Sequence, residues 1–218
     1  MTPPPVSAAI LNARLKQDEQ QYPEPSRIRL HRAISWLARA EYEAADLDAQ
    51  FIFLWVAFNA AYAREMEDGK AECERLRRFI DALIEVDLGH RLHTLVFEQF
   101  TGPIRTLIEN RFVFAPFWEA LRTLDSSGRW ERRFARSRKA ALASVMNGET
   151  AKVLSIVFDR LYVLRNQLVH GGATWNSGLN RTQVRDGAHI MQAIVPTLIE
   201  LMLDNPQVDF GAILYPVV

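Results

Sequence analysis

Apolar residues recur at helical spacing along much of the chain. After Ser26 they are spaced three or four apart, at Leu30, Ile34 and Leu37, with Trp36 beside them. The segment 51–62 follows Asp48 and is apolar nearly all round, which predicts a central helix. A further buried helix face is predicted at Leu76, Phe79, Ile80, Leu83 and Ile84.

Glycine and proline, which number 10 each, separate these helical segments. Examples are Pro23–Pro25, Gly102-Pro103, Pro116 and Gly171-Gly172. No run of alternating β-branched residues is long enough for a sheet, although 208–218 could hold a short strand or a tail. We find no internal repeat. The pattern therefore predicts an all-α protein, and 218 residues fit a single domain that comprises residues 1–218.

Composition places the chain among globular proteins, since 49% hydrophobic residues are more than a disordered chain carries. The longest stretch without a charge, 49–63, is shorter than the ~18 apolar residues of a membrane-spanning helix. The N-terminus has neither the basic region nor the apolar core of a signal peptide. The single cysteine, Cys73, excludes an intramolecular disulfide and indicates a reducing compartment. We therefore expect a soluble cytoplasmic protein without membrane contact.

Charge is unevenly distributed, although 26 basic residues balance 26 acidic ones. Residues 41–88 contain 12 acidic and 5 basic side chains (net −7), and residues 127–147 contain 1 acidic and 6 basic side chains (net +5). In the second segment, four arginines are spaced to share one face of a helix that begins at Ser126 or Ser127: Arg129, Arg132, Arg133 and Arg136. This face could bind phosphates through the planar guanidinium groups. The alternative is a solvated face that pairs with acidic neighbours.

The segment 149–172 contains an arginine in an apolar context. On a helical wheel, one arc of roughly 120° contains Leu154, Val157, Phe158, Leu161, Leu164 and Leu168. Arg165 falls inside this arc. Burial of an arginine without a partner is strongly unfavourable, so Arg165 needs a carboxylate, a phosphate or an interface that solvent reaches.

Two polar residues accompany Arg165. Asn166 and His170 are four residues apart and share one edge of the helix. Gly171-Gly172 predicts a helix end directly after His170, where the helix dipole favours the protonated imidazole. An imidazole that changes charge near neutral pH, beside a guanidinium and an amide, suits acid/base catalysis. The alternative is a histidine that caps helix carbonyls and an arginine in an internal salt bridge.

The run 165–171, Arg-Asn-Gln-Leu-Val-His-Gly, resembles the R-x(4)-H motif of the HEPN superfamily in its frequent R-N-x-x-x-H form. The apolar run 51–62 is similar to the upstream helix of bacterial members close to the Apea-like HEPN group. Trp175-Asn176-Ser177 and the segment 180–187 resemble the loop and the next helix of the same members. Residues 1–45 and 64–150 resemble nothing specific.

This resemblance implies a HEPN-like helical bundle with additional helices. HEPN domains dimerise so that two R-x(4)-H motifs face each other, and many are metal-independent endoribonucleases in toxin–antitoxin, defence or stress systems. The resemblance therefore implies RNA as the substrate and a homodimer, and it allows for an antitoxin or another regulatory protein as a partner. Such toxins often carry a tyrosine two residues after the histidine, which the antitoxin modifies, whereas this chain has Gly172 there.

In such an enzyme the ribose 2′-hydroxyl attacks the adjacent phosphate, which leaves a cyclic phosphate and a 5′-hydroxyl end. His170 would act as general acid and base, Arg165 would stabilise the charge of the phosphorane, and Asn166 would orient one of them or the phosphate. Other HEPN domains keep the fold without cleaving RNA. The alternative is therefore a non-catalytic HEPN module for dimerisation or for binding a partner protein or a nucleotide.

Two further residues are candidates for this site. Asn59 is polar within the most apolar segment, and it either orients Arg165 or His170 or bonds the backbone of a neighbouring helix. Trp175 lies in a polar loop and either stacks on an RNA base or anchors that loop. The sequence has neither a Gly-rich phosphate loop nor a cluster with metal-ligand spacing, so we expect no cofactor and no metal ion.

Overall fold

The computed structural model describes residues 6–62, 70–178, 180–211 and 213, and every regular element among them is helical. The α-helices are α1 (Ala8–Gln17), α2 (Glu24–Tyr42), α3 (Leu47–Tyr62), α4 (Lys70–Val86), α5 (Arg91–Thr94), α6 (Thr101–Glu109), α7 (Ala115–Thr123), α8 (Arg129–Met146), α9 (Thr150–Val169) and α10 (Arg181–Asp204). Shorter helical turns lie at Glu19–Gln21, Leu95–Gln99 and Arg111–Val113. The protein is an all-α helical bundle, as its sequence predicts.

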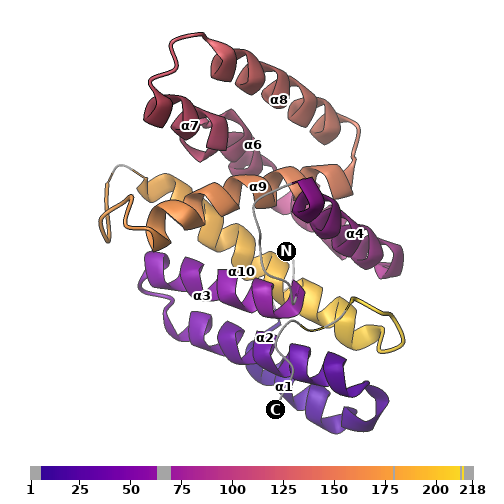
Figure 1. Ribbon diagram of the computed structural model, residues 1–218. Helices are drawn as coiled ribbons and strands as arrows, with labels where there is room; N and C mark the ends of the chain where they lie inside the picture. The colour runs from indigo at the N-terminus through magenta and orange to yellow at the C-terminus, as the bar shows by residue number, and fades with distance from the viewer. Residues whose placement is uncertain (1–5, 63–69, 179, 212, 214–218) are drawn as a thin grey trace.

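Helix α3 lies inside the bundle and packs against α2, α9 and α10 (Figure 1). Its large rings are buried apart from that of Phe53, which is half-buried; Trp55 and Phe58 are among the buried ones. Phe58 stacks on Phe158 of α9 with ring centroids 4.3 Å apart, and the centroid of Trp55 lies 6.1 Å from that of Tyr162. A helix that is apolar nearly all round has no face for solvent, so other helices must surround it. The central position predicted for 51–62 is confirmed, although Ile52, Phe53, Val56 and Ala60 are only half-buried.

The apolar faces predicted for α2 and α4 also face the core. The residues of these faces are buried or half-buried; they are Leu30, Ile34, Leu37, Leu76, Phe79, Ile80, Leu83 and Ile84. Trp36 is the exception, because it is exposed and stacks on Phe53. Trp36 lies beside the buried face of α2 because it is two residues from Ile34, a spacing that turns it away from the core.

Helix α10 crosses α3 and α9 at a glycine. A Cβ atom on Gly187 would lie 3.0 Å from Leu161 Cδ2, 3.1 Å from Phe51 Cε2 and 3.2 Å from Leu164 Cδ2. These distances are shorter than ordinary van der Waals contacts, so the absence of a side chain allows α10 to approach this closely. The close packing fixes α9 immediately before Arg165.

Helices α6, α7 and α8 lie above α9 in Figure 1 and α3 lies below it, whereas α10 crosses α9 near its C-terminal end and then runs below it. The short turn 147–149 joins α8 to α9, and the two helices form an antiparallel hairpin. Aromatic rings outside the main core pack α7 and the turn before it against α8; they are Phe114, Phe117, Trp130 and Phe134. The N-terminal half of α8 is therefore attached through its own small aromatic cluster.

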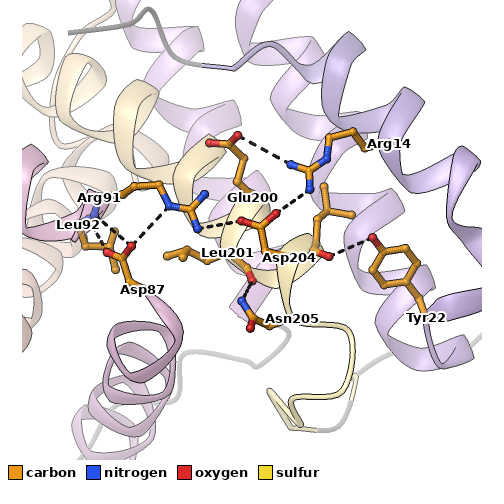
Figure 2. Close-up of polar contacts among 10 residues, drawn as sticks. Arg14, Tyr22, Asp87, Arg91, Leu92, Glu200, Leu201, Asp204 and Asn205 are labelled. Carbon is orange, nitrogen blue, oxygen red and sulfur yellow. Dashed lines mark hydrogen bonds and ion pairs between the residues drawn. The ribbon is translucent and has the colours of Figure 1, made fainter. Parts of the chain in front are cut away.

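A network of charged groups connects α1, α5 and α10 (Figure 2). Asp204 of α10 accepts one hydrogen bond from Arg14 of α1 at 2.6 Å and one from Arg91 of α5 at 2.8 Å. The buried Asp87 accepts the backbone N–H groups of Arg91 and Leu92, so it caps the N-terminus of α5. Segments that are far apart in the sequence are thus tied to the C-terminal end of α10.

Some glycines and prolines lie inside helices rather than between them. Gly102 and Pro103 belong to the first turn of α6, and α10 contains both Gly187 and Pro196. A proline in the first turn removes no intrahelical hydrogen bond, because the N–H groups there have no partner within the helix. The interpretation of Gly102-Pro103 as a break between helices is therefore wrong by one helical turn.

Two other boundaries differ from the predicted ones. Helix α8 begins at Arg129, and the residue before it is Gly128 with φ 66°, so neither Ser126 nor Ser127 starts the helix. The part of 208–218 that the structure describes contains no strand, and the remaining residues of that segment lie outside the described part. None of the described helices combines the length and the apolar character needed to cross a membrane.

Candidate functional site

Helix α9 ends at Val169, within the run 165–171 that resembles the R-x(4)-H motif. His170 follows the last helical residue, and its backbone N–H donates to Asn166 O at 3.0 Å. Gly171 has φ 68°, a left-handed conformation that glycine adopts without strain. The N–H of Ala173 then donates to Gln167 O at 3.1 Å and folds the chain back over the helix end. The helix end predicted at Gly171 is confirmed, and His170 lies at the tip of α9.

Arg165 is half-buried on α9 and is oriented by its neighbour in the sequence. Its Nη1 donates a hydrogen bond to Asn166 Oδ1 at 2.9 Å. Among the described residues, no carboxylate lies within ion-pair distance of this guanidinium. The charge of Arg165 is therefore held in place by a neutral amide and is not neutralised within the described part of the chain.

His170 is exposed, and its imidazole forms no hydrogen bond to the residues that the structure describes. Neither contact of the alternative interpretation, an imidazole on the helix carbonyls or a salt bridge of Arg165, occurs in this part of the chain. Five residues of ideal helix turn by about 140°, so Arg165 and His170 leave α9 in different directions. One copy of the chain does not direct both groups toward the same point.

Gln167, within the same run, fastens the end of α9 to the turn before α7. Its Nε2 donates to Phe112 O at 2.6 Å, and Trp118 Nε1 donates to the same carbonyl at 2.8 Å. Phe112 is 45% exposed, and its ring lies edge-on to that of Phe117 with centroids 5.4 Å apart. The sequence alone does not predict this contact of Gln167, because the acceptor is a backbone carbonyl 55 residues away.

Two aspartates at the N-terminus of α3 fasten the loop that follows α9. Asp46 Oδ2 accepts the indole N–H of Trp175 at 2.9 Å. Asp48 Oδ2 accepts Arg181 Nη2 at 2.7 Å and the backbone N–H of Asn176 at 3.2 Å. Arg181 Nη1 also donates to Asn176 Oδ1 at 2.8 Å. Anchoring of the loop by Trp175 is one of the two roles expected for this residue, whereas no local pattern predicts Asp46, Asp48 or Arg181, whose partners lie 128 to 133 residues away.

Asp46 uses both of its carboxylate oxygens. While Oδ2 holds Trp175, Oδ1 accepts the backbone N–H groups of Asp48 at 3.0 Å and Ala49 at 3.1 Å, which caps α3. The hydrogen bond from Trp175, together with those from the backbone, holds the pKa of Asp46 below its usual range. The indole N–H of Trp175 thus anchors the loop, while 74% of the residue remains exposed.

Asn59 lies away from the motif. Because Phe58 of α3 stacks on Phe158 of α9, Asn59 is level with that part of α9. Arg165 is seven residues further along α9, about 10 Å by the rise of an ideal helix. Asn59 Oδ1 is buried without a hydrogen-bond partner among the described residues. The described part of the chain contains no hydrogen bond from Asn59 to Arg165, to His170 or to the backbone of a neighbouring helix.

The four arginines predicted to share a helix face do lie together on α8. They are exposed and line an open depression with Ala135; they are Arg129, Arg132, Arg133 and Arg136. Among the described residues, no basic side chain of α8 forms an ion pair, whereas arginines of α1, α2, α4, α5 and α10 do. Hydrogen bonds from Ser127 and, to a lesser extent, the charges of Arg129 and Arg132 hold the pKa of Asp125 below its usual range. The face is therefore solvated and forms no close ion pair, but it does have the acidic neighbour that the alternative interpretation expected.

This arginine surface and the tip of α9 lie at the same end of the α8–α9 hairpin (Figure 1). Arg160 of α9 donates to Ser137 Oγ of α8 at 3.2 Å. Because the helices run antiparallel from the turn 147–149, residues before Ser137 lie level with residues after Arg160. Aromatic rings from the turn before α7 and from α7 lie between the arginine surface and the tip of α9. The ring centroid of Phe117 is 5.4 Å from that of Phe112 and 5.0 Å from that of Trp130 on α8.

Gly172 lies against the backbone of α9. A Cβ atom at this position would be 3.2 Å from Gln167 O and 3.4 Å from Gln167 Cα. Any larger side chain would require the loop to shift. The close approach therefore fits glycine and disfavours a tyrosine at this position.

Within the described ranges, no group of three or more His, Cys, Asp or Glu side chains is arranged to hold a metal ion. No family model, no curated protein and no solved structure matches the chain.

Proposed function

We propose that this protein is a metal-independent endoribonuclease of the HEPN type that acts as a homodimer. The observation that carries the proposal is Arg165, whose guanidinium is oriented by Asn166 and has no carboxylate partner among the described residues. The exposed imidazole of His170 lies at the end of the same helix. A fixed positive charge and a group that exchanges protons, brought together by two copies of the chain, suit a reaction at a phosphodiester.

The reaction would be an internal transesterification of RNA. The 2′-hydroxyl oxygen forms a bond to the adjacent phosphorus, and the bond from phosphorus to the 5′ oxygen breaks. A base takes the proton of the 2′-hydroxyl, and an acid donates a proton to the leaving oxygen. His170 transfers protons, Arg165 stabilises the additional charge of the phosphorane, and Asn166 keeps the guanidinium in place. The products are a 2′,3′-cyclic phosphate and a 5′-hydroxyl end.

This chemistry supports a dimer. The base and the acid act on opposite sides of the phosphate, whereas each chain carries one histidine at the tip of α9. Pairing of two α9 tips supplies a second His170 and brings one copy's Arg165 toward the other copy's imidazole. Val169 and Phe112, which are 46% and 45% exposed, provide apolar surface for such a contact.

The unpaired arginines of α8 favour RNA as the substrate, because a surface of this kind attracts the phosphate backbone. The resemblance of 165–171 to the R-x(4)-H motif of HEPN proteins suggests a role in toxin–antitoxin, defence or stress pathways in the cytoplasm. An antitoxin or another regulatory protein would then be a further partner. The lone Cys73 fits a reducing compartment.

The proposal is tested with the purified full-length chain and two variants, Arg165→Ala and His170→Ala. Each should lower the rate of RNA cleavage by about 100-fold or more, because general acid–base and electrostatic contributions of that size are lost. Far-UV circular dichroism and the molar mass should stay unchanged. The cleaved RNA should carry cyclic phosphate ends, and chelators should have no effect.

Two variants of exposed residues on α10, Arg185→Ala and His189→Ala, remove the same side-chain types and serve as controls. They should cleave like the wild type. The proposal fails if the wild-type chain cuts no RNA at any salt concentration and its expression leaves host growth unchanged. If Arg165→Ala then alters the molar mass or the binding of a partner, the tip of α9 belongs to a non-catalytic interaction module.

A further inference from the structure

Trp175 combines a fixed position with an exposed ring. Its indole N–H donates to Asp46 at 2.9 Å, and the residue after it is tied to the buried Asp48 through the backbone N–H of Asn176. Asn176 has φ 54°, a left-handed conformation that asparagine tolerates better than most residues. Although 74% of Trp175 is exposed, this turn and the indole hydrogen bond hold the ring in one orientation.

Stability of the fold does not account for this tryptophan. Hydrophobic stabilisation scales with the apolar area removed from water, and three quarters of this side chain remains in solvent. The ring is therefore placed where it contributes little to the core and where its face is accessible to a ligand.

The surroundings of the ring indicate the chemical class of that ligand. The neighbouring residues in the loop are polar or glycine, namely Thr174, Asn176, Ser177 and Gly178. A protein interface requires a contiguous apolar core, which a single ring among polar groups does not provide. A single flat aromatic group that is itself surrounded by polar atoms, such as a nucleobase, matches this arrangement.

We infer that Trp175 is the platform on which an unpaired base of single-stranded RNA stacks beside the cleavage site. The inference rests on the proposed function, because it makes the ligand of Trp175 part of the substrate of His170. Only four residues separate the two, and the backbone hydrogen bond from Ala173 to Gln167 keeps the intervening chain close to the tip of α9. A stacked base would fix the adjacent phosphodiester relative to Arg165 and His170.

Asp46 is the positioning residue of this platform. Its Oδ1 caps α3 and its Oδ2 holds the indole, so the two roles can be separated by substitution. Serine is also a good N-cap, but its short side chain has no second oxygen to accept the indole N–H. Asp46→Ser should therefore keep α3 capped while releasing Trp175.

The experiment measures binding of short single-stranded RNA to the full-length His170→Ala protein, which does not consume the RNA. A set of RNAs carries one abasic ribose at each position in turn. With Trp175 present, one abasic position should weaken binding by roughly 5- to 140-fold, the loss of one stacked base. Trp175→Ala should weaken binding of the intact RNA by a similar factor and should no longer respond to that abasic position.

Trp175→Phe should keep most of the dependence on the base, since it retains a π-face, and Asp46→Ser should give an intermediate loss. Tyr42→Ala removes a similarly exposed ring from α2, 79% exposed, and should bind like its parent. The inference is overturned if Trp175→Ala binds intact RNA unchanged, or if its loss is the same for every abasic RNA. It is also overturned if Trp175→Ala separates the dimer, since the ring would then belong to a contact between copies.

Failure of the proposed function gives a different result. If the wild type cleaves no RNA while its binding still depends on Trp175 and on one base position, that coupling supports the role of Trp175 in base stacking. The catalytic roles of Arg165 and His170 are then contradicted. If cleavage proceeds normally in Trp175→Ala and the coupling is absent, the platform alone falls.

Discussion

Arg160 of α9 is 4% exposed and has no ion-pair partner among the described residues. Its guanidinium lies 4.5 Å from the ring centroid of Phe114 and 5.8 Å from that of Phe134, and it donates to Ser137 Oγ. Burial lowers the pKa of Arg160 to about 10, so the side chain remains charged at neutral pH. Cation–π contacts, the Ser137 hydroxyl and the Val113 carbonyl offset only part of the desolvation cost.

We predict that Arg160→Met leaves the free energy of unfolding unchanged or raises it by about 1–3 kcal/mol, because the thioether packs on the rings without a charge to desolvate. Arg160→Ala should lower it by about 2–4 kcal/mol, because it leaves a cavity between α8 and α9. Urea denaturation of both variants checks this. A methionine variant that loses as much stability as the alanine variant would mean that the charge itself holds α8 in place.

At the scale of helices, the charged network around Asp204 links α1 and α5 to the C-terminal end of α10 (Figure 2). Burial alone would raise the pKa of Asp204, but the hydrogen bonds from Arg14 and Arg91 outweigh it and hold the pKa below its usual range. A carboxylate with a lower pKa in the folded state stabilises the fold above its unfolded pKa, about 3.9. That contribution is lost as the pH falls through the folded pKa.

We predict that Asp204→Asn lowers the free energy of unfolding by about 1 kcal/mol at pH 7, a modest value because the carboxylate is 34% exposed. The difference from the wild type should shrink as the pH falls below about 4, where the wild-type carboxylate becomes protonated. Urea denaturation between pH 7 and pH 3 measures it. Glu85→Gln removes an exposed carboxylate of α4 and should show no such convergence. If the free energies of unfolding of wild type and Asp204→Asn differ by the same amount at every pH, the hydrogen bonds from Arg14 and Arg91 do not lower the pKa of Asp204 as proposed.

Across the whole molecule, a formal charge of zero conceals a separation of paired and unpaired cations. Arginines of α1, α2, α4, α5 and α10 take part in ion pairs, whereas the basic side chains of α8 take part in none within the described part of the chain. The arginine surface of α8 lies at the same end of the hairpin as the tip of α9. The total charge therefore says little about binding, and the position of the unpaired charges says more.

We predict that replacing the four arginines of the α8 depression by glutamine weakens RNA binding and flattens its salt dependence. Each lost phosphate contact lowers the slope of log affinity against log salt by about 0.7, so four lower it by about 3. The measurement is a salt titration of RNA binding by the His170→Ala protein. Glutamine keeps the helix propensity of arginine, so α8 should remain folded.

The matched control replaces four arginines that already have acidic partners: Arg27, Arg39, Arg77 and Arg78. It removes the same amount of positive charge from α2 and α4. Equal weakening by both sets would contradict a local binding surface and would indicate only an effect of net charge.

The sequence by itself determined the features that depend on local periodicity. These are the all-α fold, the buried position of α3, the end of α9 at Gly171 and the grouping of four arginines on α8. Hydrophobic spacing and glycine conformation act within a few turns of one helix, so they can be recognised without knowledge of the partners. The roles of Arg165, Asn166 and His170 stay predictions that the experiments above test.

Only the tertiary structure decided which polar groups meet. Gln167 finds its acceptor 55 residues away and Trp175 finds Asp46 129 residues away, and no local period encodes such pairs. Arg160 lies outside the apolar arc of α9, yet it is buried because α8 covers that side, whereas Arg165 lies inside the arc and is only half-buried. A helical wheel describes one helix alone, but burial is set by every helix that packs around it.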